Sequence, residues 1–238
     1  MTRRPPCSAF TLVEMLVVMA VIAILTGLIL SLNGLVQNSA ARRRAEGEIR
    51  YMGAACEQYK ADNGGYPQGS PTPPGLTGNG PYATDLLDPN PQTTNQFGAT
   101  FDYLPTDYVP PSKGVTLFLW QQLSGHLASL DSTSIPTGTN YAGDFFKPSL
   151  LSGTTNSSGQ ITSVNYIVDP FGNPYGYSTA GLYQDQLNRA AILASGSANK
   201  NYFAGFNPTF DLWSTGGATT TTKDSNNNII TPWWVKNW

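Results

Sequence analysis

Histidine and cysteine are nearly absent from this chain of 238 residues, which contains one His and two Cys. A metal site built from His and Cys ligands, or a nucleophile activated by histidine, therefore lacks the residues it needs. The sequence contains no GxSxG, no HExxH and no glycine-rich phosphate-binding loop. We therefore predict that the protein is not an enzyme.

Charged residues are also scarce. They make up 12% of the chain, about half of the roughly 25% that is usual in soluble domains. The formal net charge of −2 gives no electrostatic attraction for nucleic acid, so we expect no such partner. The chain is instead rich in Gly (24) and Pro (18), with abundant Asn, Ser and Thr. This composition indicates a turn-rich, uncharged surface, as extracytoplasmic domains often have.

One long apolar run, residues 10–32, lies near the N-terminus. Its only polar side chains are those of Thr11, Glu14, Thr26 and Ser31. The run is long enough to span a bilayer, which takes roughly 20 residues. It is too long for the apolar core of a cleavable secretory signal. Residues 10–32 are therefore predicted to be the membrane-spanning half of an N-terminal helix.

Glu14 is the one charge inside this run, and an intramembrane carboxylate indicates a functional position by default. A cut between Ala9 and Phe10 would give Phe10 a new amine, one helical turn from Glu14. The carboxylate could equally reach the amine of a neighbouring copy. It could also simply lie in the headgroup region of an ordinary anchor.

The stretch RRPPCSAFTLVEMLVVMAVIAIL, residues 3–25, resembles the class III signal of type IV prepilins and of the pseudopilins of type II secretion. The shared pattern is a short basic leader, a small residue, then Phe-Thr-Leu-Val-Glu and an apolar helix. By this resemblance a membrane aspartic peptidase removes the leader 1–9 and N-methylates Phe10, and Glu14 guides docking into a helical filament. The residue before the cut is usually Gly, and Ala9 here is still small enough for a tight peptidase pocket.

Cleavage would also determine which cysteines remain in the mature chain. Cys7 would leave with the leader, and Cys56 would be the only cysteine of the mature chain. No intramolecular disulfide is then expected, and we interpret Cys56 as a small buried hydrophobe.

The helical pattern continues over residues 33–63, the predicted soluble half of the helix. Apolar residues at steps of three and four form one stripe that a downstream domain must cover: Ala41, Ala45, Ile49, Met52, Cys56 and Tyr59. Two i, i+4 ion pairs are expected on the exposed side, Arg42 with Glu46 and Arg44 with Glu48. The sequence Asp-Asn-Gly-Gly-Tyr-Pro at 62–67 predicts the end of the helix.

Two regions follow the helix. Residues 64–163 are predicted to be an irregular insertion with one short helix, marked by Leu119, Leu123, Leu127 and Leu130. His126, beside that stripe, is interpreted as an ordinary helix residue. Residues 164–238 are predicted to hold an antiparallel sheet and a C-terminal loop, with strand candidates at 164–168, 175–177 and 210–214. The expected fold is α+β and pilin-like, with about three short strands packed against the long helix.

Four further motifs resemble the major pseudopilin of type II secretion: YKADNGGYP at 59–67, DPFGNPYGY at 169–177, FDLWSTGG at 210–217 and NW at 237–238. In that family the loop after the third strand binds calcium through Asp carboxylates and backbone carbonyls. Here Ala218 replaces the expected Asp, so Asp224 is the remaining calcium candidate, and a polar surface turn is the favoured interpretation. Packing of Trp233, Trp234 and Trp238 is expected to hold the loop instead.

Together these resemblances imply a pseudopilin that assembles with copies of itself into the periplasmic pseudopilus of a type II secretion system. The implied partners are the prepilin peptidase and methyltransferase, the inner-membrane secretion platform and minor pseudopilins. The implied location is the bacterial inner membrane, with one membrane pass and a periplasmic globular domain. Two alternatives stay open: a type IV pilin for adhesion, motility or DNA uptake, and a membrane-anchored binding module with an intact N-terminus and no filament role.

Overall fold

The computed structural model describes residues 11–69, 84, 115–127, 129–196, 205–217 and 234–238, without the side chains of residues 28–35 and 184. Most of the predicted insertion therefore lies outside the described residues. The chain divides into two compact units, Met1–Ala41 and Arg42–Trp238, and each is described by itself.

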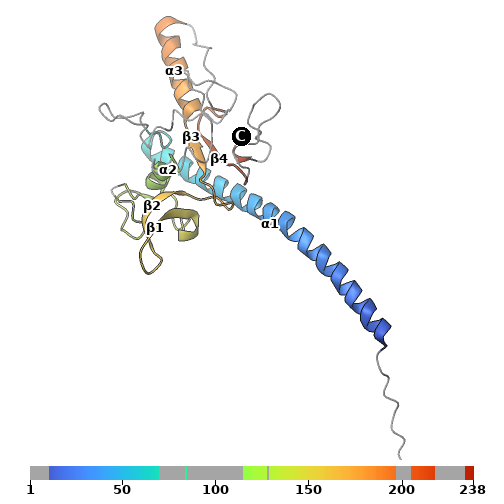
Figure 1. Cartoon of the computed structure of the whole chain (residues 1–238). Coiled ribbons are helices and arrows are strands. Elements are labelled where there is room, and N and C mark those ends of the chain that lie inside the picture. Colours follow the sequence, from blue (N-terminus) through green and yellow to red (C-terminus); the bar gives the residue numbers. More distant parts are fainter. Residues whose placement is uncertain (1–10, 70–83, 85–114, 128, 197–204, 218–233) are drawn as a thin grey trace, which may run out of the picture. The chain divides into compact units, whose positions relative to one another are not determined.

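The predicted long helix is confirmed as α1, Leu12–Asn63, drawn in blue to cyan in Figure 1. It ends where the sequence predicts an end. Gly64 adopts a φ of +76°, which glycine reaches at little cost, and its N–H donates a 2.8 Å hydrogen bond to the Lys60 carbonyl.

In the first unit, α1 carries large apolar side chains that are all exposed, from Leu12 to Leu25. Among the helices whose side chains are described, none is long and apolar enough to cross a membrane. The predicted membrane span, residues 10–32, begins before the first described residue and ends among residues whose side chains are not described. It therefore stays a prediction.

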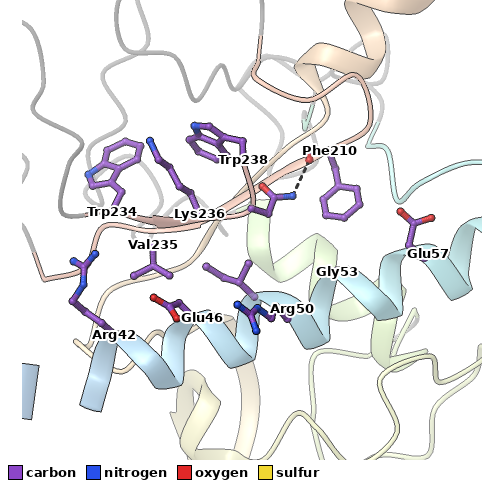
Figure 2. A pocket seen from close by; sticks show the side chains of 12 residues that line it. Arg42, Glu46, Arg50, Gly53, Glu57, Phe210, Trp234, Val235, Lys236 and Trp238 are labelled. Atoms are coloured by element: carbon purple, nitrogen blue, oxygen red, sulfur yellow. Dashed lines mark hydrogen bonds between the residues drawn. The ribbon is translucent and has the colours of Figure 1, made fainter. Parts of the chain in front are cut away.

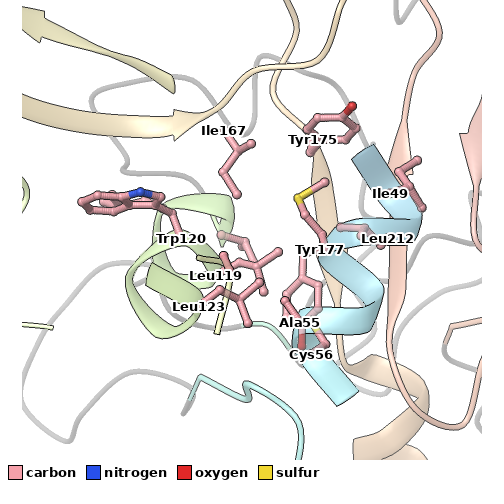
Figure 3. Packing of buried hydrophobic residues seen from close by; sticks show 14 of the residues in the cluster. Ile49, Ala55, Cys56, Leu119, Trp120, Leu123, Ile167, Tyr175, Tyr177 and Leu212 are labelled. Carbon is pink, nitrogen blue, oxygen red and sulfur yellow. The ribbon is translucent and has the colours of Figure 1, made fainter. Parts of the chain in front are cut away.

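In the second unit, the predicted apolar stripe of α1 faces the core. Ala45, Ile49, Met52 and Cys56 are at most 3% exposed, and Tyr59 packs against the same cluster. Figure 3 shows this stripe beside the side chains of α2 and of the strands. Burial also raises the pKa of the Cys56 thiol well above its ordinary value, as expected for a buried hydrophobe rather than a reactive thiol.

Helix α2, Val115–Ser124, is the predicted short helix, and its Leu119 and Leu123 are fully buried. It is shorter than the leucine spacing predicts, because Gly125 takes a φ of +78° and ends it. Leu127 lies beyond the helix and is half exposed.

His126 is not a helix residue, so that interpretation was wrong. It follows Gly125, is buried, and stacks on Trp120 with ring centroids 5.0 Å apart. Its ring nitrogens lie 2.9 Å from Ser124 Oγ and 3.0 Å from the Ser134 carbonyl oxygen. The ring therefore helps hold the loop after α2 against the helix.

A two-stranded antiparallel sheet follows the short 3-10 helix η2, Pro148–Leu150. It pairs β1, Leu151–Thr155, with β2, Ile161–Ile167. The strand candidate at 164–168 therefore begins earlier than predicted. Its partner β1 lies in the region expected to be irregular, because the sequence LSGTT has only one large apolar residue to indicate a strand.

A second sheet contains β3, Gly176–Ser178, β4, Asp211–Ser214, and β5, Val235–Lys236, in the antiparallel order β3-β4-β5. The predicted α+β architecture of a long helix with a small antiparallel sheet is thus confirmed. The composition of the sheet differs, since β5 takes the place expected for β2. One more helix, α3 (Ala180–Ser195), lies between β3 and β4 and was not predicted.

Candidate functional site

The first turn of α1 is held by a reciprocal pair of side chains. The backbone N–H and the hydroxyl of Thr11 each donate a 2.9 Å hydrogen bond to Glu14 Oε2. In return, the Glu14 N–H donates to Thr11 Oγ1 at 3.3 Å. This is a capping box, in which two donors at the helix start that have no intrahelical partner are satisfied by side chains. Glu14 therefore has a role within its own chain, at the positive end of its own helix.

The predicted processing residues, Ala9 and Phe10, lie outside the described residues. Cleavage between them and a contact between the Phe10 amine and Glu14 stay predictions. Sequence reasoning placed Glu14 beside an amine or in the headgroup region of the membrane, and missed Thr11. The signal was present, because Thr followed three residues later by Glu before an apolar run is the sequence signature of a capping box.

The soluble half of α1 is joined to the DPFGNPYGY motif by a buried carboxylate. Glu48 is 7% exposed, which corrects the expectation that it lies on the solvent side. Its Oε1 accepts a 2.6 Å bond from Arg44 Nε, the predicted i, i+4 pair. Its Oε2 accepts a 2.6 Å bond from the hydroxyl of Tyr175. Both oxygens of this buried carboxylate therefore have a partner, as burial of a charge requires.

The same motif is joined to FDLWSTGG through Asp169, which is 2% exposed. Burial raises the pKa of this carboxyl, although the hydrogen bonds it accepts act in the opposite direction. Oδ1 accepts the N–H groups of Phe171 and Asn173, and Oδ2 accepts the Ser214 hydroxyl at 2.5 Å. Asp169 therefore closes its own turn and fixes it to the end of β4.

The remaining two motifs meet FDLWSTGG from other directions. Asn237 accepts the Leu212 N–H at 2.9 Å and donates to the Phe210 carbonyl at 3.1 Å. The ring of Tyr66 lies 5.1 Å from the Phe210 ring, centroid to centroid. The four motifs thus form one connected cluster with structural contacts.

Two of the three C-terminal tryptophans pack as the sequence predicts. The Trp234 ring stacks on that of Trp213 at 6.1 Å, and Trp238 meets the same indole edge-on at 6.1 Å. Trp233 and the calcium candidate Asp224 lie outside the described residues. The described residues contain no group of three or more His, Cys, Asp or Glu that could hold a metal ion. The calcium site therefore stays untested.

A groove of about 630 Å³ runs between α1 and β5 (Figure 2). Its α1 side carries charges of both signs, and its other side is mainly aromatic and aliphatic. The charged lining residues are Arg42, Glu46, Arg50, Glu57 and Lys236. With cations and carboxylates alternating along the helix, the groove has no single-sign field that would select an anion or a cation.

Comparison with known proteins gives a match to the N-terminal segment. The family model of the prokaryotic N-terminal methylation motif matches residues 4–30. No curated protein and no solved structure matches the chain. The matched signal implies processing by a prepilin peptidase, and anchoring in the inner membrane through the N-terminal helix with the domain in the periplasm. Proteins that carry it are typically structural rather than enzymatic. Residues 4–30 of the chain therefore carry the N-terminal methylation motif, the class III signal for prepilin cleavage that type IV pilin-like proteins have.

Proposed function

We propose that this chain is a pseudopilin subunit of a type II secretion system. It is cut between Ala9 and Phe10, methylated on the Phe10 amine, and assembled with copies of itself into a periplasmic pseudopilus. The observation that carries the proposal is the connected cluster of the four motifs, which the sequence shares in order with the major pseudopilin. These motifs occupy the second unit, which the methylation motif at 4–30 does not reach.

The capping box supplies a physical role for Glu14 before assembly. In the single chain, the carboxylate is held at the helix start by Thr11. After cleavage, the amine of Phe10 is one residue before this turn, so a cation becomes available close to a carboxylate that is already oriented. Docking beside another subunit would allow Glu14 to exchange the Thr11 bonds for that subunit's amine. In an apolar surrounding, the attraction of the carboxylate for a cationic amine is stronger than its bonds to the uncharged Thr11 donors.

The partners under this proposal are the prepilin peptidase, the inner-membrane secretion platform and minor pseudopilins. Calcium would be bound, if at all, through Asp224 and neighbouring backbone oxygens, the ligand type that Ca²⁺ prefers. Catalysis has no part in the proposal, because the chain acts by binding.

Deletion of the gene in the source bacterium tests the proposal. The deletion strain is complemented with the wild type, with Glu14→Ala, or with Asp144→Ala as a control at an exposed carboxylate of the second unit. We expect exported proteins to stay in the periplasm of the deletion strain. The wild type and the control should restore export, and Glu14→Ala should not.

Two other outcomes would contradict the proposal. Unchanged export with loss of surface fibres, motility or DNA uptake would identify a type IV pilin. Unchanged export with an intact leader and no filament would identify an anchored binding module.

A further inference from the structure

Helix α3 carries a face, partly buried near the start of the helix and exposed near its end, on which apolar residues flank an ion pair. At about 100° per residue, five side chains fall within roughly 100° of the helix circumference: Leu182, Asp185, Arg189, Ile192 and Leu193. Arg189 Nε lies 2.7 Å from Asp185 Oδ2, and these side chains are 75% and 37% exposed.

The apolar part of this face lies mainly at the C-terminal end of α3. Leu193 is 88% exposed and Ile192 is 47% exposed, whereas Leu182 near the start of the helix is partly buried and packs against the core of its own chain. Ile192 and Leu193 lie about 100° apart around the helix axis, at the two edges of the face, and together they expose apolar surface at the end of the helix.

We propose that this face binds the same face of a second copy of the chain, with the two α3 helices antiparallel. A two-fold axis makes such a contact self-complementary, since each residue meets the same partner in both directions. The register that places Asp185 opposite Arg189 of the second copy also places Leu182 opposite Ile192 of the second copy. Two ion pairs then lie at the centre of the contact, with an apolar pair on each side.

The charges of the face favour a second copy over an unrelated partner. The face carries one carboxylate and one guanidinium, four residues apart. Two antiparallel copies therefore place each carboxylate opposite a guanidinium, and the charges of the contact balance. A parallel arrangement in the same register would oppose like charges. Since a two-fold contact cannot propagate into a helical filament, it is distinct from the head-to-tail contacts that the proposed function requires.

Two charge-reversal variants, Asp185→Lys and Arg189→Glu, test this pairing in the full chain solubilised in detergent. Sedimentation equilibrium measures self-association of each variant alone and of an equimolar mixture. Either variant alone opposes like charges in both pairs of the contact, so we expect self-association about tenfold weaker than in the wild type. In the mixture, the new lysine of one variant meets the new glutamate of the other. The unchanged Arg189 of the first likewise meets the unchanged Asp185 of the second, so association should return.

The mixture separates the proposed contact from effects within one helix. Each variant keeps its own like-charge i, i+4 pair after mixing, so a loss of helix or of folding would not be repaired. Ala194→Lys, on the opposite side of α3, is the matched control and should associate as the wild type does. A monomeric wild type, or a mixture that stays as weak as the separate variants, would overturn the proposal.

Discussion

The hydroxyl of Tyr175 donates a 2.6 Å hydrogen bond to Glu48 Oε2 inside the second unit, across 127 positions of sequence. Arg44 binds the other carboxylate oxygen. This relationship fixes the DPFGNPYGY segment to α1 with a charged acceptor, which makes the bond stronger than one between neutral groups. It accounts for a carboxylate lying among the core residues of the helix.

Tyr175→Phe removes the donor and leaves Glu48 Oε2 without its protein partner. We expect the free energy of unfolding to fall by about 1.5–3 kcal/mol, measured by urea titration with tryptophan fluorescence. Tyr51→Phe is the matched control, because Tyr51 is 45% exposed and donates to the neutral Ala142 carbonyl at 3.0 Å. Its loss should be smaller, about 0.5–1.5 kcal/mol. Equal losses in the two variants would show that the buried charge adds nothing.

Asp169 should make the unfolding free energy depend on pH. Burial raises the pKa of this carboxyl above its ordinary value of 3.8, so the folded protein holds the proton more tightly than the unfolded chain does. Its contribution to stability is therefore fully present below pH 3.8 and is lost as the pH rises through the folded-state pKa. Asp169→Asn does not titrate, so the stability of the wild type relative to this variant should fall as the pH rises. Urea titrations at several pH values measure this difference. A constant or increasing difference would contradict the assignment.

Thr11→Val removes the hydroxyl of the capping box and keeps the branched side chain. We expect the free energy of opening the first turn of α1 to fall by about 1 kcal/mol, because the Glu14 N–H loses its acceptor and the Glu14 carboxylate loses one donor. Hydrogen exchange at the Glu14 amide should then become about fivefold faster, as the opening free energy falls. Thr11→Ser keeps the hydroxyl and should exchange as the wild type does. Equal rates in all three proteins would remove the capping role of Thr11.

Gly176 lies against the indole of Trp213, and a Cβ at this position would fall on that ring. Gly176→Ala should therefore destabilise the protein by about 1–3 kcal/mol through overpacking, together with a shift in tryptophan fluorescence. Gly47 on the exposed side of α1 has open space around it. Gly47→Ala should stabilise the protein by about 0.5–1 kcal/mol, through the better helix propensity of Ala. A neutral Gly176→Ala would mean that Trp213 can move aside freely.

The sequence predicts those elements whose signals are local. Helix α1 has two such signals. The spacing of its apolar residues predicts the buried stripe through Ala45, Ile49 and Met52, and Gly64 predicts its end. Helix α3 has part of such a signal, since Ala, Leu, Gln and Arg favour helix and Gly196 follows it with a φ of +71°. It was not predicted, since no acidic residue in its first turn marks the start of a helix.

Other features depend on distant partners and have no local signal. Strand β5 has two residues, Val235–Lys236, and exists because β4 supplies its hydrogen bonds. The spacing of Glu48 from Arg44 predicts a solvent-facing ion pair, because the sequence does not show that Tyr175 binds the same carboxylate. At the site, the importance of Glu14 followed from the cost of a carboxylate in an apolar run, whereas the spacing of Thr11 and Glu14 is a local signal of a capping box that was overlooked.

The most direct test of the central claim is the intact mass and N-terminal sequence of the protein extracted from its native membrane. We expect a chain that begins at N-methyl-Phe10 and contains Cys56 as its only cysteine. A chain that still begins at or near Met1 would contradict it, because Glu14 would then have no amine to meet and no subunit would be ready to assemble.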